Sequence, residues 1–161
     1  MIEPLAAVDS GPLIGLARIG QLELLHRLTR KTIVPPAVWS EVTANAELPG
    51  AAAVMAASWI IQEEPDQQAA GALRILLGRG EAEAIALAQS LPGCLFLVDD
   101  ARARRIAERM NIRCMGTLGL LRRAKECGMI DALRPFLEAL QANGVYITQA
   151  LADAVLRKVG E

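Results

Sequence analysis

The stretch "PLAAVDSGPLIGLARIG", residues 4–20, decides the fold, because a short apolar run ends there on a carboxylate and turns into a helix-like pattern. Residues 5–8 have the length and composition of a buried strand, and Asp9 follows them directly. The next three residues, Ser-Gly-Pro, are typical of a turn and of the first turn of a helix. Asp9 therefore has two interpretations at this stage, a helix cap or a functional carboxylate at a strand end.

Composition predicts one globular domain spanning residues 1–161, since 53% of the residues are hydrophobic and 22% are charged. No apolar run approaches the roughly 18 residues of a membrane span, and the N-terminus lacks the features of a signal peptide. We therefore expect a cytoplasmic protein with no membrane partner. The three cysteines are unclustered and there is one histidine, which argues against disulfides and a zinc site.

Short apolar runs alternate with helical patterns along the chain, which predicts an α/β sandwich around a mainly parallel sheet. The expected strands are 5–8, 32–34, 94–98 and 112–115. The expected helices are 12–19, 22–28, 35–42, 80–91, 100–110, 118–129, 132–140 and 147–159. Loops are expected at 44–50 and 62–68.

Acidic residues follow two of the predicted strands. Asp9 follows the first, and the doublet Asp99 and Asp100 follows the run "LFLV". Ligands of open parallel sheets gather outside the carboxyl ends of the strands, so these side chains are candidates for one site. A helix cap would account for one of the two strand ends but leaves the other unexplained.

Two glutamates in helical segments are further candidates. Glu41 lies among hydrophobic residues in "AVWSEV", and Glu81 opens the helix that follows "LLGRG". On a helical wheel Glu81 is in line with Ile85, which places its carboxylate above the stripe that faces the sheet, whereas Glu83 points elsewhere. The alternative for Glu81 is a favourable interaction with the helix dipole, because the residue lies in the first turn.

Carboxylates that converge at one sheet edge repel one another, so a divalent cation is their natural counter-charge. Oxygen ligands without histidine or cysteine favour Mg²⁺ or Mn²⁺ over zinc. Such a site suits phosphodiester hydrolysis, in which the ion activates a water and neutralises the leaving oxygen. The sequence contains no glycine-rich phosphate-binding loop of the nucleotide-binding kind.

Basic residues concentrate after the aspartate doublet, although the whole chain carries a formal net charge of −1. Between residues 102 and 125 there are eight basic side chains and one acidic side chain. Arg102, Arg105 and Arg109 share one face of the expected helix. They are candidates for a nucleic-acid-binding track of phosphate contacts, and the alternative is an ordinary solvated helix face.

Together these segments resemble the PIN-domain superfamily, and in particular a PIN-related prokaryotic domain of unknown function that is similar to the VapC toxin ribonucleases. The motifs that carry the resemblance are "VDSGPLIGLARIGQLELL", "VPPAVWSEV", "GRGEAEAIALA", "LVDDARARRIAERM" and "GTLGLLRRAKECGMI". They follow the family's order and cover most of residues 5–130. The resemblance implies a three-layer α/β/α fold, frequent homodimers and, in many relatives, a toxin neutralised by a cognate antitoxin.

The resemblance also implies a set of metal-binding and catalytic positions. They are Asp9, Glu41, Glu81 and Asp99, with Asp100 and Glu83 as adjuncts. Typical VapC-type chains carry Thr or Ser at the end of the last acidic strand and an Asp slightly later. Here the doublet follows Val98 directly, so the fourth ligand stays open between Asp99 and Asp100.

The expected function is that of a Mg²⁺- or Mn²⁺-dependent endoribonuclease, the toxin of a toxin–antitoxin pair. A non-catalytic PIN-like interaction module is the alternative, and a phosphatase is a weaker one because the second Asp of the haloacid dehalogenase motif is missing after Asp9. The apolar C-terminal helices, at about 131–161, predict an interface with a second copy or with an antitoxin.

Overall fold

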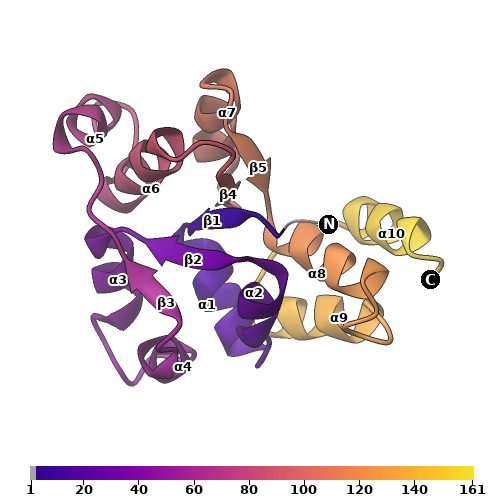
Figure 1. The fold of residues 1–161 in the computed structure, drawn as a ribbon. Helices are drawn as coiled ribbons and strands as arrows, with labels where there is room; N and C mark the ends of the chain where they lie inside the picture. Colours follow the sequence, from indigo (N-terminus) through magenta and orange to yellow (C-terminus); the bar gives the residue numbers. More distant parts are fainter. Residues whose placement is uncertain (1–2) are drawn as a thin grey trace.

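The computed structural model describes residues 3–161, and within them the strands form one five-stranded parallel sheet (Figure 1). The strands are β1 (Leu5–Val8), β2 (Lys31–Val34), β3 (Ile60–Gln62), β4 (Leu95–Leu97) and β5 (Arg113–Met115). Their order is β3-β2-β1-β4-β5. The chain therefore moves outward in one direction from β1 to β3 and in the other from β4 to β5. The switch point lies between β1 and β4, where ligands of such sheets bind.

Helices cover both faces of the sheet and complete the three-layer α/β/α sandwich (Figure 1). They are α1 (Ser10–Arg18), α2 (Glu23–Leu28), α3 (Pro36–Thr43), α4 (Ala51–Ala56), α5 (Gln67–Leu73), α6 (Arg79–Ser90), α7 (Ala101–Arg109), α8 (Thr117–Glu126), α9 (Arg134–Ala142) and α10 (Gln149–Lys158). Helices α5, α6 and α7 lie on one face, and α1, α2 and α8 lie on the other. This arrangement follows from right-handed crossovers between parallel strands.

The core lies on both faces of the two central strands. Phe96 of β4 is fully buried, as are Leu13 and Leu16 of α1 and Ile85 of α6. Each such side chain contributes about 1.5–3 kcal/mol on burial. The start of α1 is thereby fixed directly after β1, which holds Asp9 at the sheet edge.

The four strands expected from the sequence are confirmed, and so is the loop at 44–50 between α3 and α4. Strand β3 and the helices α4 and α5 were not predicted from the sequence. Strand β3 has three residues, of which only Ile60 is buried, so it carries no alternating pattern. Helix α5 contains Gly71 and two glutamines, and residues expected as loop at 62–68 supply the end of β3 and the start of α5.

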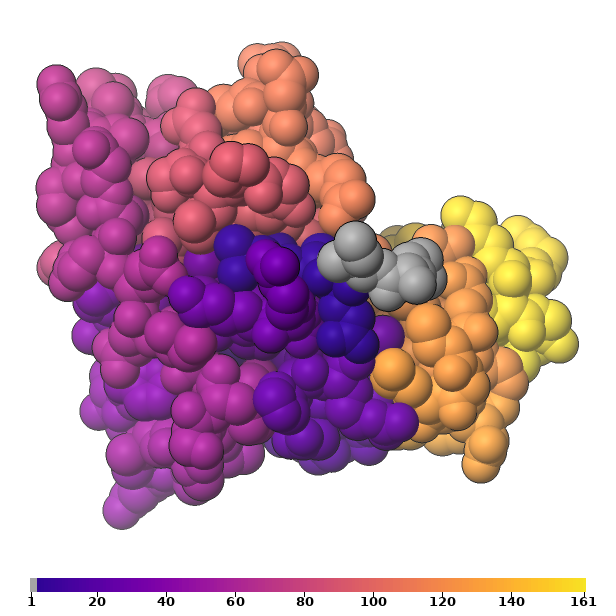
Figure 2. Space-filling view, viewed as in Figure 1, coloured from indigo at the N-terminus to yellow at the C-terminus, as the bar shows by residue number. Residues whose placement is uncertain are grey.

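The C-terminal helices belong to the same core as the rest of the domain. Leu137 and Leu140 of α9 and Leu156 of α10 are buried against it. The hydrophobic core therefore includes side chains from the segment at about 131–161, for which the sequence predicted an interface. Helices α9 and α10 lie at one end of the molecule, beside α8 (Figures 1 and 2). No helix between residues 3 and 161 is long and apolar enough to cross a membrane.

Candidate active site

The acidic residues come together at the carboxyl ends of β1 and β4. The Asp9 amide donates a hydrogen bond of 2.9 Å to the Leu97 carbonyl, so the ends of the two central strands are tied to each other. Asp99 and Asp100 directly follow Val98, which is the first residue after β4. Helix α3 brings Glu41 to the same edge and the first turn of α6 brings Glu81, since both charges act on Asp9.

Asp9 is the buried member of this group, with 4% of its surface exposed. It occupies the N-cap position of α1 (φ −80°, ψ 167°), yet its side chain makes no capping hydrogen bond. Its Oδ1 atom is buried and has no hydrogen-bond partner within the described part of the chain. Capping therefore does not account for Asp9. A buried polar atom without a partner costs on the order of 1–3 kcal/mol, so a functional reason is needed.

The electrostatic surroundings oppose a negative charge on Asp9. Burial raises its pKa from the ordinary value of 3.8 to about 7. The Ser10 backbone amide lowers the pKa, but the charges of Glu81, Glu41 and Asp100 raise it. The carboxylate thus lies where a cation would offset both its burial and the repulsion of its neighbours.

Glu41 and Glu81 lie side by side at the start of α6. A Cβ atom built on Gly80 would lie 2.5 Å from Oε1 of Glu41, so the missing side chain of Gly80 leaves room for that carboxylate. Glu81 accepts a hydrogen bond of 3.2 Å from the Gly78 amide through Oε2, which satisfies one free donor of the helix terminus. Both the helix-end interpretation of Glu81 and its proximity to Asp9 are therefore seen in the structure.

The aspartate doublet divides its contacts between two helices. Asp100 caps α7, because its Oδ1 accepts a hydrogen bond of 2.8 Å from the Ala103 amide. Asp99 instead accepts two hydrogen bonds from Thr117 at the start of α8, 2.7 Å from the amide and 2.6 Å from the hydroxyl. Of the two charges, that of Asp100 acts on Asp9. The structure thus places Asp100 with the carboxylates around Asp9 and Asp99 toward α8.

Glu83 lies apart from this group and has its own partners. It is 1% exposed and accepts hydrogen bonds from Arg74 at 2.8 Å and from Arg79 at 3.0 Å. A third bond, of 3.2 Å, comes from the Ala37 amide at the start of α3. These bonds account for the burial of Glu83 and give it a structural role, joining α3 to α6.

A divalent ion fits this edge by the chemistry of its donors. Asp9 offers a buried carboxylate oxygen with no hydrogen-bond partner among the described residues, and the charges that raise its pKa belong to carboxylates, which Mg²⁺ and Mn²⁺ prefer. As the side chains stand, no three His, Cys, Asp or Glu residues among residues 3–161 are close enough together to hold a metal ion. The residues present match the ion, and its binding requires their carboxylates to move closer together.

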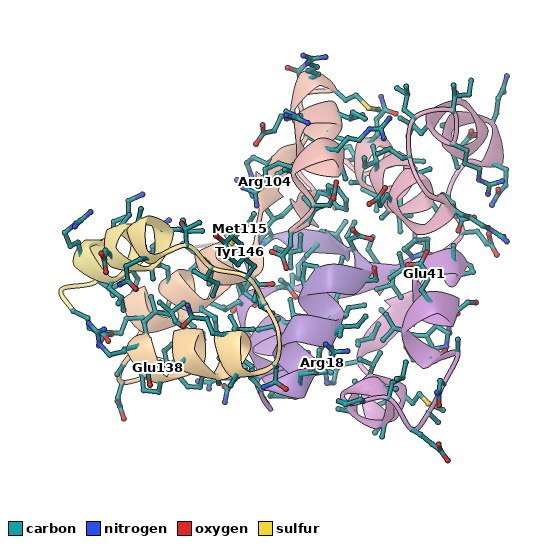
Figure 3. All side chains as sticks on the ribbon, turned by 180° about the vertical axis from the view of Figure 1, so that it is seen from behind. Arg18, Glu41, Arg104, Met115, Glu138 and Tyr146 are labelled. Atoms are coloured by element: carbon teal, nitrogen blue, oxygen red, sulfur yellow. The ribbon has the colours of Figure 1, made fainter. Side chains whose placement is uncertain are left out.

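A cleft of about 740 Å³ opens next to Asp99, between the start of α8 and the segment that joins α9 to α10. Arg105 lines it, whereas Arg102 and Arg109, the other two arginines selected from the sequence, do not. Arg104 and Tyr146 also line it and were not selected (Figure 3). The sequence signal for Tyr146 was available, since a lone tyrosine within the polar stretch "QANGVYIT" is unusual for a core residue.

The fold and the acidic edge agree with a comparison to known families. A family model described as a PIN domain matches residues 5–161, and the chain therefore belongs to this family. The resemblance of the sequence motifs to PIN domains is thereby confirmed, and the match extends over both C-terminal helices. Among curated proteins, no sequence matches the chain. PIN domains as a class are nucleases that typically use divalent metals, which sets the general class of chemistry.

Proposed function

We propose that this protein is an endoribonuclease that requires Mg²⁺ or Mn²⁺ and hydrolyses RNA phosphodiester bonds at the edge formed by β1 and β4. The observation that carries the proposal is the buried Oδ1 of Asp9, which has no hydrogen-bond partner among residues 3–161 while three further carboxylates act on it. An interaction module would gain nothing from such an arrangement. A nuclease gains a site for a cation.

The residues that would hold the ion are Asp9, Glu41, Glu81 and Asp100, with Asp99 next to them on the side of the cleft. When bound, the ion supplies a more acidic water and charge neutralisation at the scissile phosphate. Asp9 gives up the proton that its raised pKa retains in the ion-free protein. Thr117 fixes the carboxylate of Asp99 through two hydrogen bonds and so orients it.

The helix N-termini around the site assist the approach of an RNA backbone. Helices α1, α6, α7 and α8 begin next to Asp9, Glu81, Asp100 and Asp99 in turn, so four helix N-termini lie at this edge, and some of their amides donate to these carboxylates. Such amides favour anions. Their partial positive charge also offsets part of the repulsion between the carboxylates.

The biological setting belongs to the same proposal and rests on the similarity to VapC-like toxins. A cytoplasmic toxin of this kind would be held inactive by a cognate antitoxin protein and would act as a homodimer. The whole of residues 1–161 would form its single domain, with the C-terminal segment at about 131–161 contributing to an interface.

The test is cleavage of labelled single-stranded RNA by purified protein free of any antitoxin. We expect cleavage with Mg²⁺ or Mn²⁺, none with EDTA, and a decrease by orders of magnitude for Asp9→Asn, because an amide oxygen coordinates these ions weakly. Asp66→Asn is the matched control, since Asp66 caps α5 through a 2.7 Å bond from the Ala69 amide. Cleavage that survives Asp9→Asn at the wild-type rate would remove Asp9 from the site.

A further inference from the structure

The cleft beside Asp99 combines an apolar surface with cationic side chains. Leu140 and Ile147 form part of its lining and are buried, whereas Tyr146, which directly precedes Ile147 in the sequence, is 89% exposed. Leu151 adds a side chain that is 46% exposed. An aromatic ring presented in this way, at the wall of a cleft, offers a flat surface to a planar ligand. Figure 3 shows Tyr146 near Met115 and Arg104.

Positive charges outnumber negative ones around the same cleft. Its charged lining residues are Arg104, Arg105, Arg122 and Lys158 against Asp99. Within residues 3–161, neither Arg105 nor Lys158 forms an ion pair, so both are available to an anion. The carboxylate of Asp99 is already engaged by Thr117. The cleft is therefore suited to a ligand that is both anionic and aromatic.

The position of the cleft indicates how such a ligand would reach the carboxylates. Asp99 lines the cleft and belongs to the acidic edge, and Gly11, in the first turn of α1, also lines it. A Cβ atom on Gly11 would lie 3.6 Å from Oδ2 of Asp99, so the backbone of α1 and the Asp99 side chain are close neighbours. The cleft is thus continuous with the start of α1, directly after Asp9.

We propose that this cleft binds one unpaired nucleotide of single-stranded RNA next to the scissile phosphate. The ring of Tyr146 stacks on the base, and Arg105 and Lys158 contact the adjoining phosphates. Aromatic side chains stack on any base, whereas a paired base is covered by its neighbours in a duplex. The inference rests on the proposed nuclease function and adds to it a subsite for a base, formed by Tyr146 at the wall of the cleft.

Binding in the presence of EDTA tests the cleft without cleavage and without the metal site. The probe is a short, fluorescently labelled single-stranded RNA of mixed sequence, followed by anisotropy. Tyr146→Ala should weaken its binding by roughly 5- to 100-fold, the range expected for loss of one stacked base. Tyr146→Phe keeps the ring and should bind as wild type does. Ile75→Ala is the matched control, because Ile75 is 84% exposed and lies away from the cleft.

The charged wall is tested by two arginines of the same helix. Arg102 and Arg105 are both exposed on α7, and only Arg105 lines the cleft. Arg105→Ala should reduce the slope of log affinity against log salt concentration by about 0.7, the value for one lost contact to a single strand. Arg102→Ala should leave the slope unchanged. Equal effects of the two variants would contradict the cleft and support a general basic helix face.

The remaining outcomes separate this inference from the nuclease proposal. If Tyr146→Ala binds single-stranded RNA as tightly as wild type does, the nucleotide cleft is overturned and the metal site is unaffected. The same conclusion follows if wild type binds an RNA duplex as tightly as a single strand. A change in self-association on Tyr146→Ala, with RNA binding intact, would assign the cleft to a protein partner and also overturns it. If wild type binds no RNA at low salt, the cleft inference fails, and metal-dependent stabilisation of the protein then shows whether the ion site survives.

Discussion

Asp9 and Asp100 occupy the same position relative to their helices but differ in what their carboxylates contact. Asp100 caps α7 through the Ala103 amide, whereas Asp9 makes no capping bond and leaves a buried oxygen without a partner in the part of the chain that the structure describes. The sequence offered capping as the ordinary explanation for an aspartate at either strand end. Only the contacts show that it applies to Asp100 and fails for Asp9.

The stability of the ion-free protein should depend on pH through Asp9. Because its pKa is raised from 3.8 to about 7, the folded state loses stability as pH rises above the unfolded value, and the loss is complete above about 7. The full effect corresponds to on the order of 4 kcal/mol. Asp9→Asn removes this titration, so with EDTA at pH 8 the variant should melt at a higher temperature than wild type.

The same comparison at about pH 4 serves as the internal control, because this pH lies close to the unfolded pKa of 3.8 and well below the folded value of about 7. Little of the penalty remains there, so the two melting temperatures should nearly converge. Asp66→Asn provides a second control, since Asp66 caps α5 through the Ala69 amide. Asparagine caps a helix about as well as aspartate does, so this variant should change the melting temperature little at either pH. A melting temperature of Asp9→Asn below that of wild type at pH 8 would contradict the electrostatic description of the site.

At the scale of elements, α6 carries two glutamates with different roles, Glu81 in its first turn and Glu83 just after it. The charge of Glu81 raises the pKa of Asp9, whereas Glu83 binds two arginines and the start of α3. The helical wheel predicted different directions for the two side chains, and in the structure they have different partners. It could not identify Arg74 and Ala37 as partners of Glu83, because Arg74 precedes α6 and Ala37 lies in a helix far away in the sequence.

Glu83→Gln should destabilise the fold and leave metal binding unchanged. Loss of the buried charge weakens its bonds to Arg74 and Arg79, and we expect a cost of about 2 kcal/mol, below the usual range for a broken buried pair because both arginines are partly exposed. Urea denaturation measures the cost. Glu81→Gln should show the opposite pattern, with a small change in stability and a reduced effect of Mn²⁺ on the melting temperature. A reversal of the two patterns would make Glu83 the ligand.

The three elements that the sequence analysis did not predict are all short. Strand β3 buries only Ile60, and α4 and α5 are short helices of six and seven residues. Segments of this length show little periodicity, and their structure depends on packing against the rest of the domain. The central strands β1 and β4, by contrast, are buried on both faces and are evident as continuous apolar runs.

At the scale of the whole molecule, the sequence identified the acidic edge but not the cleft beside it. The acidic residues follow strands or begin helices, and the rules of parallel sheets bring those positions together. The cleft is lined by Asp99 on one side and by Tyr146, between α9 and α10, on the other. No local pattern in the sequence predicts how α9 and α10 pack beside α8. Arg104 was missed for a related reason, since the helical wheel grouped the arginines without the position of the cleft.

The oligomeric state remains a prediction at this scale. The C-terminal helices bury Leu137 and Leu156 in the domain's own core, so they have less spare apolar surface than the sequence indicated. The similarity to VapC-like toxins still leads us to expect a homodimer. Sedimentation velocity over a range of protein concentrations measures it, and a monomer throughout, with no antitoxin present, would contradict the dimer.

The most direct measurement for the central claim is a thermal shift series on wild type and Asp9→Asn, with EDTA, Mg²⁺ and Mn²⁺ at pH 7. It needs no knowledge of the natural RNA. An ion that binds the folded carboxylates alone stabilises the protein by about 2.7 kcal/mol at a hundred times its Kd, so the melting temperature of wild type should rise with ion concentration. Asp9→Asn should lose most of this rise. Melting temperatures that stay the same in both proteins with and without either ion would contradict the metal site and the nuclease function built on it.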